Sequence, residues 1–358
     1  MRVKLEDVCV KGTSNLKQSD VIDKTGEYPI YGAAGYIGSV DFYHQDQPYV
    51  AVVKDGAGIG RTSLHPAKSS VIGTMQYLLP KKNILPEYLC YVVRYMHLEK
   101  YFTGATIPHI YFKDYKNEAF NLDTLDRQRE IVDILGKTEG IIASRQKELQ
   151  KLDDLIKARF VELFGDPVYN TNDLPIRSLN ELGSWASGGT PSRTVPEYFK
   201  GNIDWYSAGE LNKLFLEGSV EKITEEAIEK STTKLFKAGS LLIGMYDTAA
   251  FKMGILKEDS ASNQACACIT PNDEVNIIWL YYELQMMKNH FLSQRRGVRQ
   301  KNLNLGMIKA FKIPIAKRDQ QDEFSDFVKQ VDKSKVAIQA ALDKTQLLFD
   351  SLMQKYFG

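Results

Sequence analysis

The sequence predicts an α+β chain in which two globular domains alternate with two long helices, in the order domain, helix, domain, helix. Three observations carry this prediction. A shift of 193 positions, which takes Asp126 onto Asp319, aligns residues 126–165 with residues 319–358 without a gap. Both segments have the apolar spacing of a coiled-coil helix, and the stretches before them are rich in Gly, Tyr and β-forming residues. The 358 residues also exceed one ordinary hydrophobic core.

Composition limits the class of protein. Hydrophobic residues make up 43% and charged residues 25%, as in soluble globular proteins. The formal net charge is +1, so any nucleic-acid binding must come from local patches and not from overall charge. We expect a cytoplasmic protein without a membrane span, because we find no leader sequence and no long apolar run. The four cysteines fit reduced, buried thiols, and the spacing of Cys266 and Cys268 does not suit a zinc site.

The first domain, residues 1–122, is predicted to contain short strands separated by Gly turns. Its glycine-rich run from Asp55 to Thr62 superficially resembles a phosphate-binding loop. The run lacks the Lys-Ser/Thr ending of that motif, and we interpret it as a hairpin turn. The expected strands are 28–31, 36–42, 49–54 and 75–79, and the expected helix is 87–101.

The first long helix is expected within residues 123–165, where an apolar residue recurs every seven positions. This series is Leu135, Ile142, Leu149, Ile156 and Leu163. A mixed companion series is Ile131, Thr138, Arg145, Leu152 and Arg159. Gly136 and Gly140 weaken this helix by about 1 kcal/mol each, so they either fray its start or admit another helix closely. Gly165 and Pro167 are expected to end it.

The second domain, residues 166–315, repeats the plan of the first. Both domains close with a strand, a proline, an aromatic-rich helix, a glycine and a polar loop that returns to the long helix. Gly104 and Gly297 are also 193 positions apart, so the repeat extends into the domains. We therefore expect a pseudo-two-fold internal repeat of shared ancestry. The expected strands are 205–207, 240–245 and 265–270, and the expected helix is 277–292.

The second long helix, within residues 316–358, has the stronger apolar stripe. The stripe comprises Phe324, Val328, Val331, Ile338, Leu342, Phe349, Leu352 and Tyr356. Only Lys335 and Thr345 interrupt it. Such a narrow stripe is best buried by a helix of the same period, so we expect the two helices to pair antiparallel as a coiled coil. The alternative is that each helix packs only on its neighbouring domain.

Antiparallel pairing would place the two domains at opposite ends of the helices. A helix from Gln128 to Phe164 would be about 55 Å long at 1.5 Å per residue. This length exceeds the roughly 34 Å of one DNA turn, which separates the half-sites of many bipartite DNA-binding proteins. The sequence therefore suggests two reading units held by a spacer.

Motifs for catalysis are weak throughout the chain. The five histidines show no metal-ligand spacing, and no Ser/His/Asp or Cys/His arrangement can be placed. The string Asp166-Pro167-Val168-Tyr169 resembles the Asp-Pro-Pro-Tyr of amino-methyltransferases, but no cofactor-binding glycines precede it. We interpret it as a turn, and nothing in the sequence argues for an enzyme.

The strongest signal for binding is the basic run of residues 288–301, which contains no acidic residue. Arg can pair bidentately with guanine, Asn or Gln can pair with adenine, and further cations neutralise phosphates. A solvated basic loop is the alternative. The matching segment of the first domain, residues 103–113, is much less basic. Its polar residues include His109 and Lys113.

Several strings are distinctive. Gly188-Gly189-Thr190-Pro191-Ser192-Arg193 precedes Pro196-Glu197-Tyr198-Phe199, and the first domain contains Gly26-Glu27-Tyr28-Pro29-Ile30-Tyr31-Gly32. The first long helix opens with Arg127-Gln128-Arg129-Glu130-Ile131, and Gln321 and Glu323 recur in the second. With the internal repeat, these strings resemble the specificity (S) subunit of Type I restriction–modification systems over essentially the whole chain. Gly12-Thr13-Ser14 departs from the family pattern, because the Thr-Pro is missing there.

The resemblance implies two target-recognition domains, residues 1–122 and 166–315, each reading half of a bipartite site in double-stranded DNA. The conserved helical spacers of that family would correspond to residues 123–165 and 316–358. The chain would be non-catalytic and hold no cofactor. Modification (methyltransferase) and restriction (motor nuclease) partner subunits would use S-adenosylmethionine, ATP and Mg. Two other hypotheses are a coiled-coil adaptor that binds proteins and not DNA, and a methyltransferase or nuclease acting alone.

We select candidate DNA contacts from the polar loops of both domains. In the first domain they are Lys54, Arg61, Thr62, His109 and Lys113. In the second domain they are Thr190, Ser192, Arg193, Arg295, Arg296, Arg299, Lys301 and Asn302.

Overall fold

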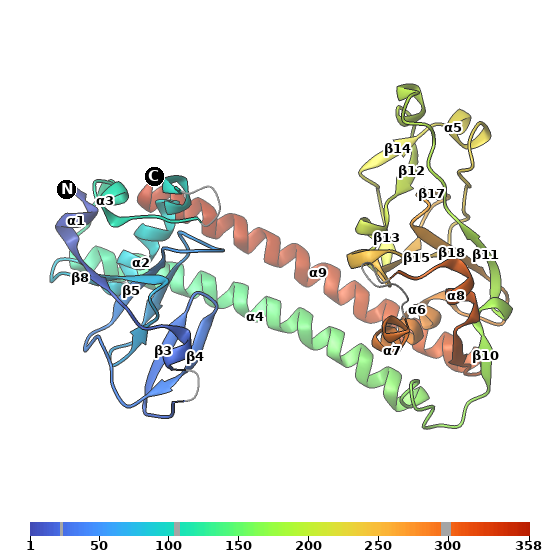
Figure 1. The fold of residues 1–358 in the computed structure, drawn as a ribbon, viewed down its shortest axis with the longest axis horizontal. Coiled ribbons are helices and arrows are strands. Elements are labelled where there is room, and N and C mark those ends of the chain that lie inside the picture. The colour runs from blue at the N-terminus through green and yellow to red at the C-terminus, as the bar shows by residue number, and fades with distance from the viewer. Residues whose placement is uncertain (22–23, 104–107, 295–301) are drawn as a thin grey trace. The chain divides into compact units, whose positions relative to one another are not determined.

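The computed structural model describes residues 1–21, 24–103, 108–294 and 302–358. The chain divides into two compact units. Unit 1 comprises Met1–Lys147 with Gln339–Gly358, and unit 2 comprises Glu148–Ile338. Each long helix therefore contributes one part to each unit (Figure 1). No helix among the described residues is both long enough and apolar enough to cross a membrane.

Unit 1 is built on a four-stranded antiparallel sheet with the order β2-β8-β5-β6. These strands are β2 (Cys9–Thr13), β8 (Met75–Pro80), β5 (Tyr49–Val53) and β6 (Thr62–His65). A smaller sheet has the order β4-β3-β7, from β4 (Gly35–Val40), β3 (Tyr28–Gly32) and β7 (Ser70–Val71). A third pair joins β1 (Arg2–Lys4) to β9 (Ala119–Asn121). The short helix α1 (Leu5–Val8) directly follows β1 in the sequence, and the short helix α3 (Phe112–Tyr115) precedes β9.

The core of unit 1 covers both faces of its large sheet. Every residue of β5 is buried. Val50 and Val52 pack with Leu89 of α2 (Pro86–Tyr95), whereas Tyr49 and Ala51 pack in a second cluster on the opposite face. Alternate residues of a strand point to opposite faces, so a strand covered on both sides is apolar along its whole length.

The helix expected at 87–101 ends earlier than predicted. Helix α2 stops at Tyr95, and His97 has a φ of 51° before the 3-10 turn η2 (Leu98–Tyr101). A left-handed residue cannot continue a right-handed α-helix, so the chain turns at this point. The expected helix of the second domain is likewise divided at Met287.

Unit 2 repeats this plan with one additional strand. Its large sheet has the order β11-β18-β15-β16-β13, and a smaller sheet has the order β14-β12-β17. The strands of the large sheet are β11 (Gly183–Ser187), β18 (Cys266–Pro271), β15 (Leu241–Gly244), β16 (Met253–Leu256) and β13 (Phe215–Leu216). Those of the smaller sheet are β14 (Glu221–Ile223), β12 (Ile203–Tyr206) and β17 (Ala261–Ser262). The pair β10 (Ile176–Ser178) and β19 (Lys312–Pro314) corresponds to β1 and β9. The predicted internal repeat is confirmed.

The helices of unit 2 include α6 (Ile277–Met286), which packs against β16 as α2 packs against β6 in unit 1. The others are α5 (Glu225–Glu229), α7 (Lys288–Ser293) and α8 (Leu305–Ala310).

Cys266 and Cys268 lie on β18 and are buried, and burial raises the pKa of both thiols to about 12. These thiols therefore stay protonated near neutral pH.

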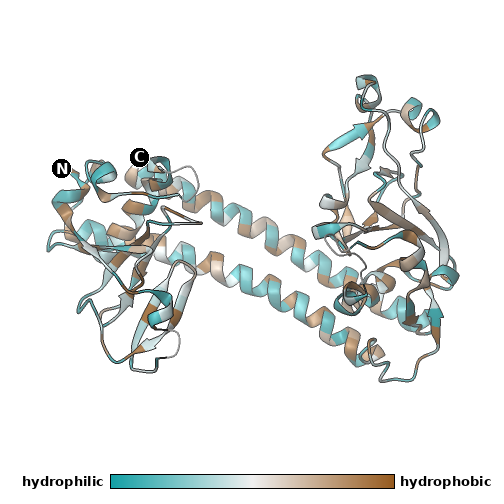
Figure 2. Ribbon diagram, in the orientation of Figure 1, coloured by the Kyte–Doolittle hydropathy of each residue, from teal (hydrophilic) through white to brown (hydrophobic). Residues whose placement is uncertain are grey.

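The long helices α4 (Leu125–Phe164) and α9 (Arg318–Phe357) agree with the predicted heptad pattern. Apolar and polar residues alternate along both (Figure 2). Helix α4 continues through Gly136 and Gly140, so the glycines do not fray it. A Cβ on Gly136 would lie 3.9 Å from the Tyr91 hydroxyl of α2, and one on Gly140 would have open space around it.

The two long helices are antiparallel, as predicted. In unit 1 the beginning of α4 meets the end of α9, where Arg127 lies over the ring of Tyr356 at 5.7 Å. In unit 2 the end of α4 meets the beginning of α9, where the Phe160 and Phe324 rings are 5.4 Å apart. Both helices also join the apolar core of each unit, so they pack on the domains as well as on each other.

The identical residues Gln128 and Gln321 have equivalent buried positions. The Gln128 side-chain oxygen accepts from the Leu85 amide at 2.9 Å, and its nitrogen donates to the Asn83 and Asp123 carbonyls. The Gln321 oxygen accepts from the Asn276 amide at 2.8 Å, and its nitrogen donates to the Glu274 and Ala316 carbonyls. Each glutamine thereby joins the start of a long helix to the segment before α2 or α6.

Candidate nucleic-acid interface

In both units, segments distant in sequence meet at one end of the large sheet, which we call the loop end. In unit 2, β11 and β15 end there and β18 begins there. The Gly188 amide donates to the Cys266 carbonyl at 3.1 Å, and the Met245 amide donates to the Ala265 carbonyl at 2.9 Å. The loop end of unit 2 thus comprises residues 188–194, 245–251, 263–265 and 302–303.

The glycines of the predicted loop 188–194 permit close backbone packing. A Cβ on Gly188 would lie 2.2 Å from the Asn263 carbonyl oxygen, and one on Gly189 would lie 2.6 Å from that of Thr232. The Trp205 indole donates to the Gly189 carbonyl at 3.0 Å. A larger residue at either glycine would push the loop away from the sheet, so these glycines fix its position.

Two of the candidate polar residues in this loop bond to neighbouring side chains. The Thr190 hydroxyl donates to the side-chain oxygen of Gln264, across the loop end. The Ser192 hydroxyl lies 2.8 Å from that of Thr194, and Ser192 is exposed. Thr190 and Ser192 therefore lie where a ligand of the loop end could reach them.

Arg193 has several protein partners. Its guanidinium lies 4.2 Å from the Phe199 ring centre and 5.2 Å from that of Trp205. Its two terminal nitrogens bond to the two carboxylate oxygens of Glu221, one of them at 2.8 Å. The hydrogen bond from Arg193 lowers the pKa of the Glu221 carboxyl. Arg193 thus joins loop 188–194 to the smaller sheet, since Trp205 lies on β12 and Glu221 on β14.

In unit 2, residues 302 and 303 lie at the loop end beside β15. They belong to the segment that leads back toward α9, which we call the return segment, and residues 108–111 are its counterpart in unit 1. The Leu303 amide donates to the Met245 carbonyl at 2.8 Å. The Asn302 side-chain oxygen accepts from the Asp247 amide at 3.0 Å, next to Tyr246, whose side chain is 40% exposed. Asn302 therefore lies at the loop end. The remaining candidates of this segment, Arg295, Arg296, Arg299 and Lys301, lie outside the described residues.

The loop end of unit 1, residues 54–62, 72–76 and 108–113, is built in the same way. The Ile110 amide donates to the Lys54 carbonyl at 2.9 Å, as Leu303 does to Met245 in unit 2. The His109 ring nitrogen Nδ1 lies 2.7 Å from Asp55 Oδ1. Lys113 Nζ lies 5.4 Å from the centre of the exposed Tyr111 ring. Asp55 joins the candidates Lys54 and His109, since Lys54 Nζ lies 3.7 Å from its other oxygen, whereas Lys113 contacts Tyr111.

The glycine-rich run 55–62 is a hairpin turn, as predicted, and connects the antiparallel strands β5 and β6. Gly56, Gly58 and Gly60 have φ values of 83°, 86° and 80°. The candidate Arg61 folds back on this turn, and its Nε donates to the Gly58 carbonyl at 3.3 Å. The candidate Thr62 donates its hydroxyl to the Gly60 carbonyl at 3.1 Å. Both side chains therefore bond to the backbone of the turn that carries them and stabilise it.

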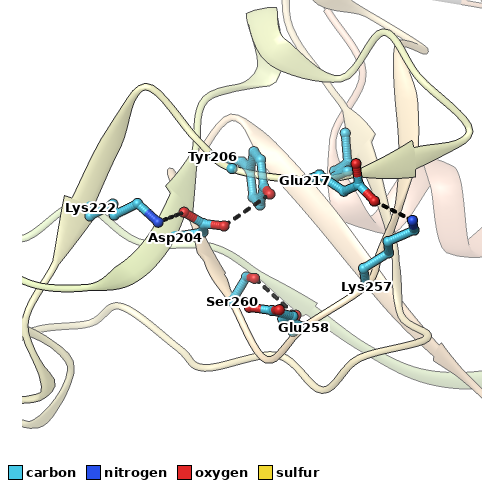
Figure 3. A pocket seen from close by; sticks show the side chains of 9 residues that line it. Asp204, Tyr206, Glu217, Lys222, Lys257, Glu258 and Ser260 are labelled. Carbon is cyan, nitrogen blue, oxygen red and sulfur yellow. Dashed lines mark hydrogen bonds and ion pairs between the residues drawn. The ribbon is translucent and has the colours of Figure 1, made fainter.

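A cavity of about 330 Å³ lies in unit 2 beside the smaller sheet and is lined mainly by polar residues (Figure 3). Lys222 Nζ pairs with Asp204 Oδ1 at 2.7 Å, and the Tyr206 hydroxyl donates to the other oxygen of Asp204 at 3.3 Å. Lys257 pairs with Glu217. These two ion pairs join strands and loops around the cavity, and Glu258 is a third carboxylate in its lining.

Sequence reasoning missed two exposed residues of the loop ends, Gln264 and Tyr246. Gln264 follows Asn263 two residues before the apolar strand β18, and this polar pair near a strand boundary is the signal that marks it. Tyr246 directly follows Met245 at the end of β15. Their assignment to one site needs the sheet order, because they lie on different connections.

Comparison with known proteins gives a consistent result. A family model described as the Type I restriction modification DNA specificity domain matches residues 1–154 and 172–346. The specificity subunit of the Type I restriction enzyme EcoR124I/EcoR124II from Escherichia coli is 24% identical over 213 residues, covering 57% of this chain and 52% of that protein. This chain therefore spans about half the length of that relative.

Two further similarities extend over more of the chain. The Type I restriction enzyme MjaVIII specificity subunit of Methanocaldococcus jannaschii is 22% identical over 319 residues, covering 79% of this chain and 72% of that protein. The crystal structure of a Type I restriction–modification S subunit from M. genitalium superposes with a TM-score of 0.65 at 14% identity. It covers 100% of this chain and 96% of that chain, and it shows the same fold.

Proposed function

The chain belongs to the Type I restriction modification DNA specificity family, and we propose that it is the non-catalytic, sequence-reading subunit of a Type I restriction–modification enzyme. Residues 1–122 and 166–315 form two target-recognition domains, and each reads one half of a bipartite site in double-stranded DNA. Residues 123–165 and 316–358 form the helical spacers.

One observation supports this proposal most directly: the same loop end is built twice with different polar residues. The return segment bonds to the end of the third strand of the sheet order through Ile110 and Lys54 in unit 1, and through Leu303 and Met245 in unit 2. Around this shared backbone contact, His109 in one unit corresponds to Asn302 in the other. A repeated frame with unlike side chains suits two domains that read different bases.

The chemistry of these side chains fits the major groove of DNA. Lys54 and Lys113 can neutralise phosphates, whereas Asn302 and Ser192 present donors and acceptors for base edges. Since the net charge of the chain is only +1, attraction to DNA must come from such local groups. Contacts to bases then specify the sequence, and contacts to phosphates position the protein.

The long helices offer a repeated surface for partner subunits. Leu155 and Leu348 are identical positions of the repeat, and their side chains are 48% and 53% exposed. An apolar residue left exposed at the same place in both copies suits a partner that binds twice. We propose that modification subunits dock on the helices and that restriction subunits join this assembly in the cytoplasm. S-adenosylmethionine, ATP and Mg would be bound and used by those partner subunits.

DNA binding by the assembled complex tests this function. The full chain is co-expressed with its modification subunits, and gel-shift titrations compare DNA fragments that contain or lack the site methylated by that complex. We expect tight binding to the site and weaker binding elsewhere. A complex that forms but binds no DNA would instead support a coiled-coil adaptor. Methylation of DNA by this chain alone would support an enzyme.

A further inference from the structure

Gln264 lies at the middle of the short connection between β17 and β18, at the loop end of unit 2. Its neighbours hold this connection firmly. The Asn263 amide donates to the Tyr206 carbonyl at 2.9 Å, and the Ala265 amide donates to the Asn263 side-chain oxygen at 3.0 Å. The Gln264 residue itself is exposed. Its backbone is therefore fixed while its side chain reaches solvent.

Thr190 orients the amide of Gln264. The Thr190 hydroxyl donates to the Gln264 side-chain oxygen, which keeps a second lone pair for another donor. Among the residues that the structure describes, the Gln264 amide nitrogen has no hydrogen-bond partner, and because the residue is exposed this nitrogen is available as a donor. The hydrogen bond from Thr190 thus selects one orientation of the amide, with one acceptor and one donor group still available.

The position of Thr190 is in turn fixed on both sides. Before it, the Gly189 amide donates to the Ser262 carbonyl at 2.9 Å, and the Gly189 carbonyl accepts from Trp205. After it, Arg193 is held by the Phe199 ring and by Glu221. Arg193 is therefore a positioning residue, because it fixes the loop that carries Thr190. A polar group oriented by its supports before binding loses little entropy when it binds.

We propose that Gln264 determines specificity in the second half-site by reading an adenine in the major groove. This inference rests on the proposed function. A glutamine amide can accept from adenine N6 and donate to adenine N7 at the same time, and the available groups of Gln264 are this acceptor and this donor. Thr190 fixes the orientation that makes both bonds. The neighbouring Ser192 and Asn302 remain available for other contacts.

The other half of the repeat lacks this device. Strands β7 and β8 correspond to β17 and β18, and the residue that stands two before β8, as Gln264 stands two before β18, is Gly73. A glycine has no side chain with which to read a base. The first half-site must therefore be read by other residues of unit 1, and removal of Gln264 should affect only the second half-site.

Methylation mapping with Gln264→Ala tests the inference. The full chain is co-expressed with its modification subunits, and methylated motifs are mapped for wild type, Gln264→Ala and the control Gln47→Ala. Gln47 is exposed and precedes β5, at the end of that strand opposite the loop end of unit 1. We expect Gln264→Ala to accept other bases at one A·T position of one half-motif, with discrimination reduced about 10- to 100-fold. The other half-motif and the control should match wild type.

Thr190→Val separates orientation from direct reading. If Thr190 acts through Gln264, the single variant relaxes the same A·T position, and adding it to Gln264→Ala causes no further change. If the double variant loses more discrimination at this position than either single variant, the orienting role of Thr190 is overturned. If Gln264→Ala methylates the same two-part motif as wild type, the inference is overturned and the proposed function still stands. A wild-type complex without a two-part motif would overturn both.

Discussion

Two buried glutamines, Gln128 and Gln321, bond to backbone groups in equivalent places of the two units. Gln321 makes one accepted and two donated hydrogen bonds to backbone groups, and it is fully buried. The repeat marked Gln128 and Gln321 as identical, but it did not indicate what they bond. Two of the three partners of each glutamine belong to the segment before α2 or α6, which is distant in sequence, so these bonds follow from the fold and not from the local pattern.

We predict that Gln321→Ala lowers the free energy of unfolding by about 3 kcal/mol, because it leaves several buried backbone groups without partners. Urea unfolding followed by circular dichroism measures this loss. The adjacent Gln320→Ala is the control, since Gln320 is half-buried and lies on a different side of α9. Equal losses in the two variants would contradict the role assigned to Gln321.

Glu283 is the most unusual titratable residue of unit 2. It lies on α6, only 1% of its surface is exposed, and its Oε1 has no hydrogen-bond partner among the described residues. Burial raises its pKa well above the ordinary value. The folded protein therefore keeps a proton that the unfolded chain releases above about pH 4.3. Folding is weakened as pH rises from that value toward the folded pKa.

We predict that Glu283→Gln removes this penalty and raises the free energy of unfolding at pH 8 by about 1–3 kcal/mol. Its stability should also fall less than that of wild type between pH 5 and pH 8. Thermal unfolding across this pH range measures both effects, with Glu225→Gln on the exposed start of α5 as the control. A pH profile parallel to that of wild type would contradict the assignment.

At the scale of elements, the long helices were predictable and the shorter breaks were not. The seven-residue stripe is a local pattern, so it located α4 and α9 and their buried faces. The left-handed turn at His97 and the division at Met287 depend on packing that no local pattern shows. Likewise, loop 188–194 could be recognised from its residues, but the partners of Arg193 come from separate strands.

The antiparallel helix pair makes a further prediction. Phe324 of α9 is fully buried and packs edge-to-face against Phe160 and Phe164 of α4 and Tyr282 of α6. We expect Phe324→Ala to lower the free energy of unfolding by about 3–5 kcal/mol, because it leaves a cavity where three elements meet. Phe327→Ala, at a half-buried position one turn away, should cost clearly less in the same urea titration. A loss for Phe324→Ala below that of Phe327→Ala would contradict this packing.

At the scale of the whole molecule, the internal repeat gives the two units the same frame and different loop ends. The large sheets of both units share the same order of four strands, to which unit 2 adds β13, and the long helices contribute a part to each unit. The polar residues of the loop ends differ between the units: unit 1 has Lys54, His109 and Lys113, and unit 2 has a set that includes Thr190, Gln264 and Asn302. Under the proposed function, a shared frame with unlike loops leads us to expect that each unit reads one half of the DNA motif.

An exchange of residues 166–315 tests this central claim most directly. The segment is replaced by the corresponding segment of another specificity subunit, the chimera is co-expressed with the modification subunits, and methylated motifs are mapped in cellular DNA. We predict a two-part motif in which only the half read by unit 2 changes, while the half read by unit 1 and the spacing stay as in wild type. A motif that changed in both halves, or one that did not change at all, would contradict the account.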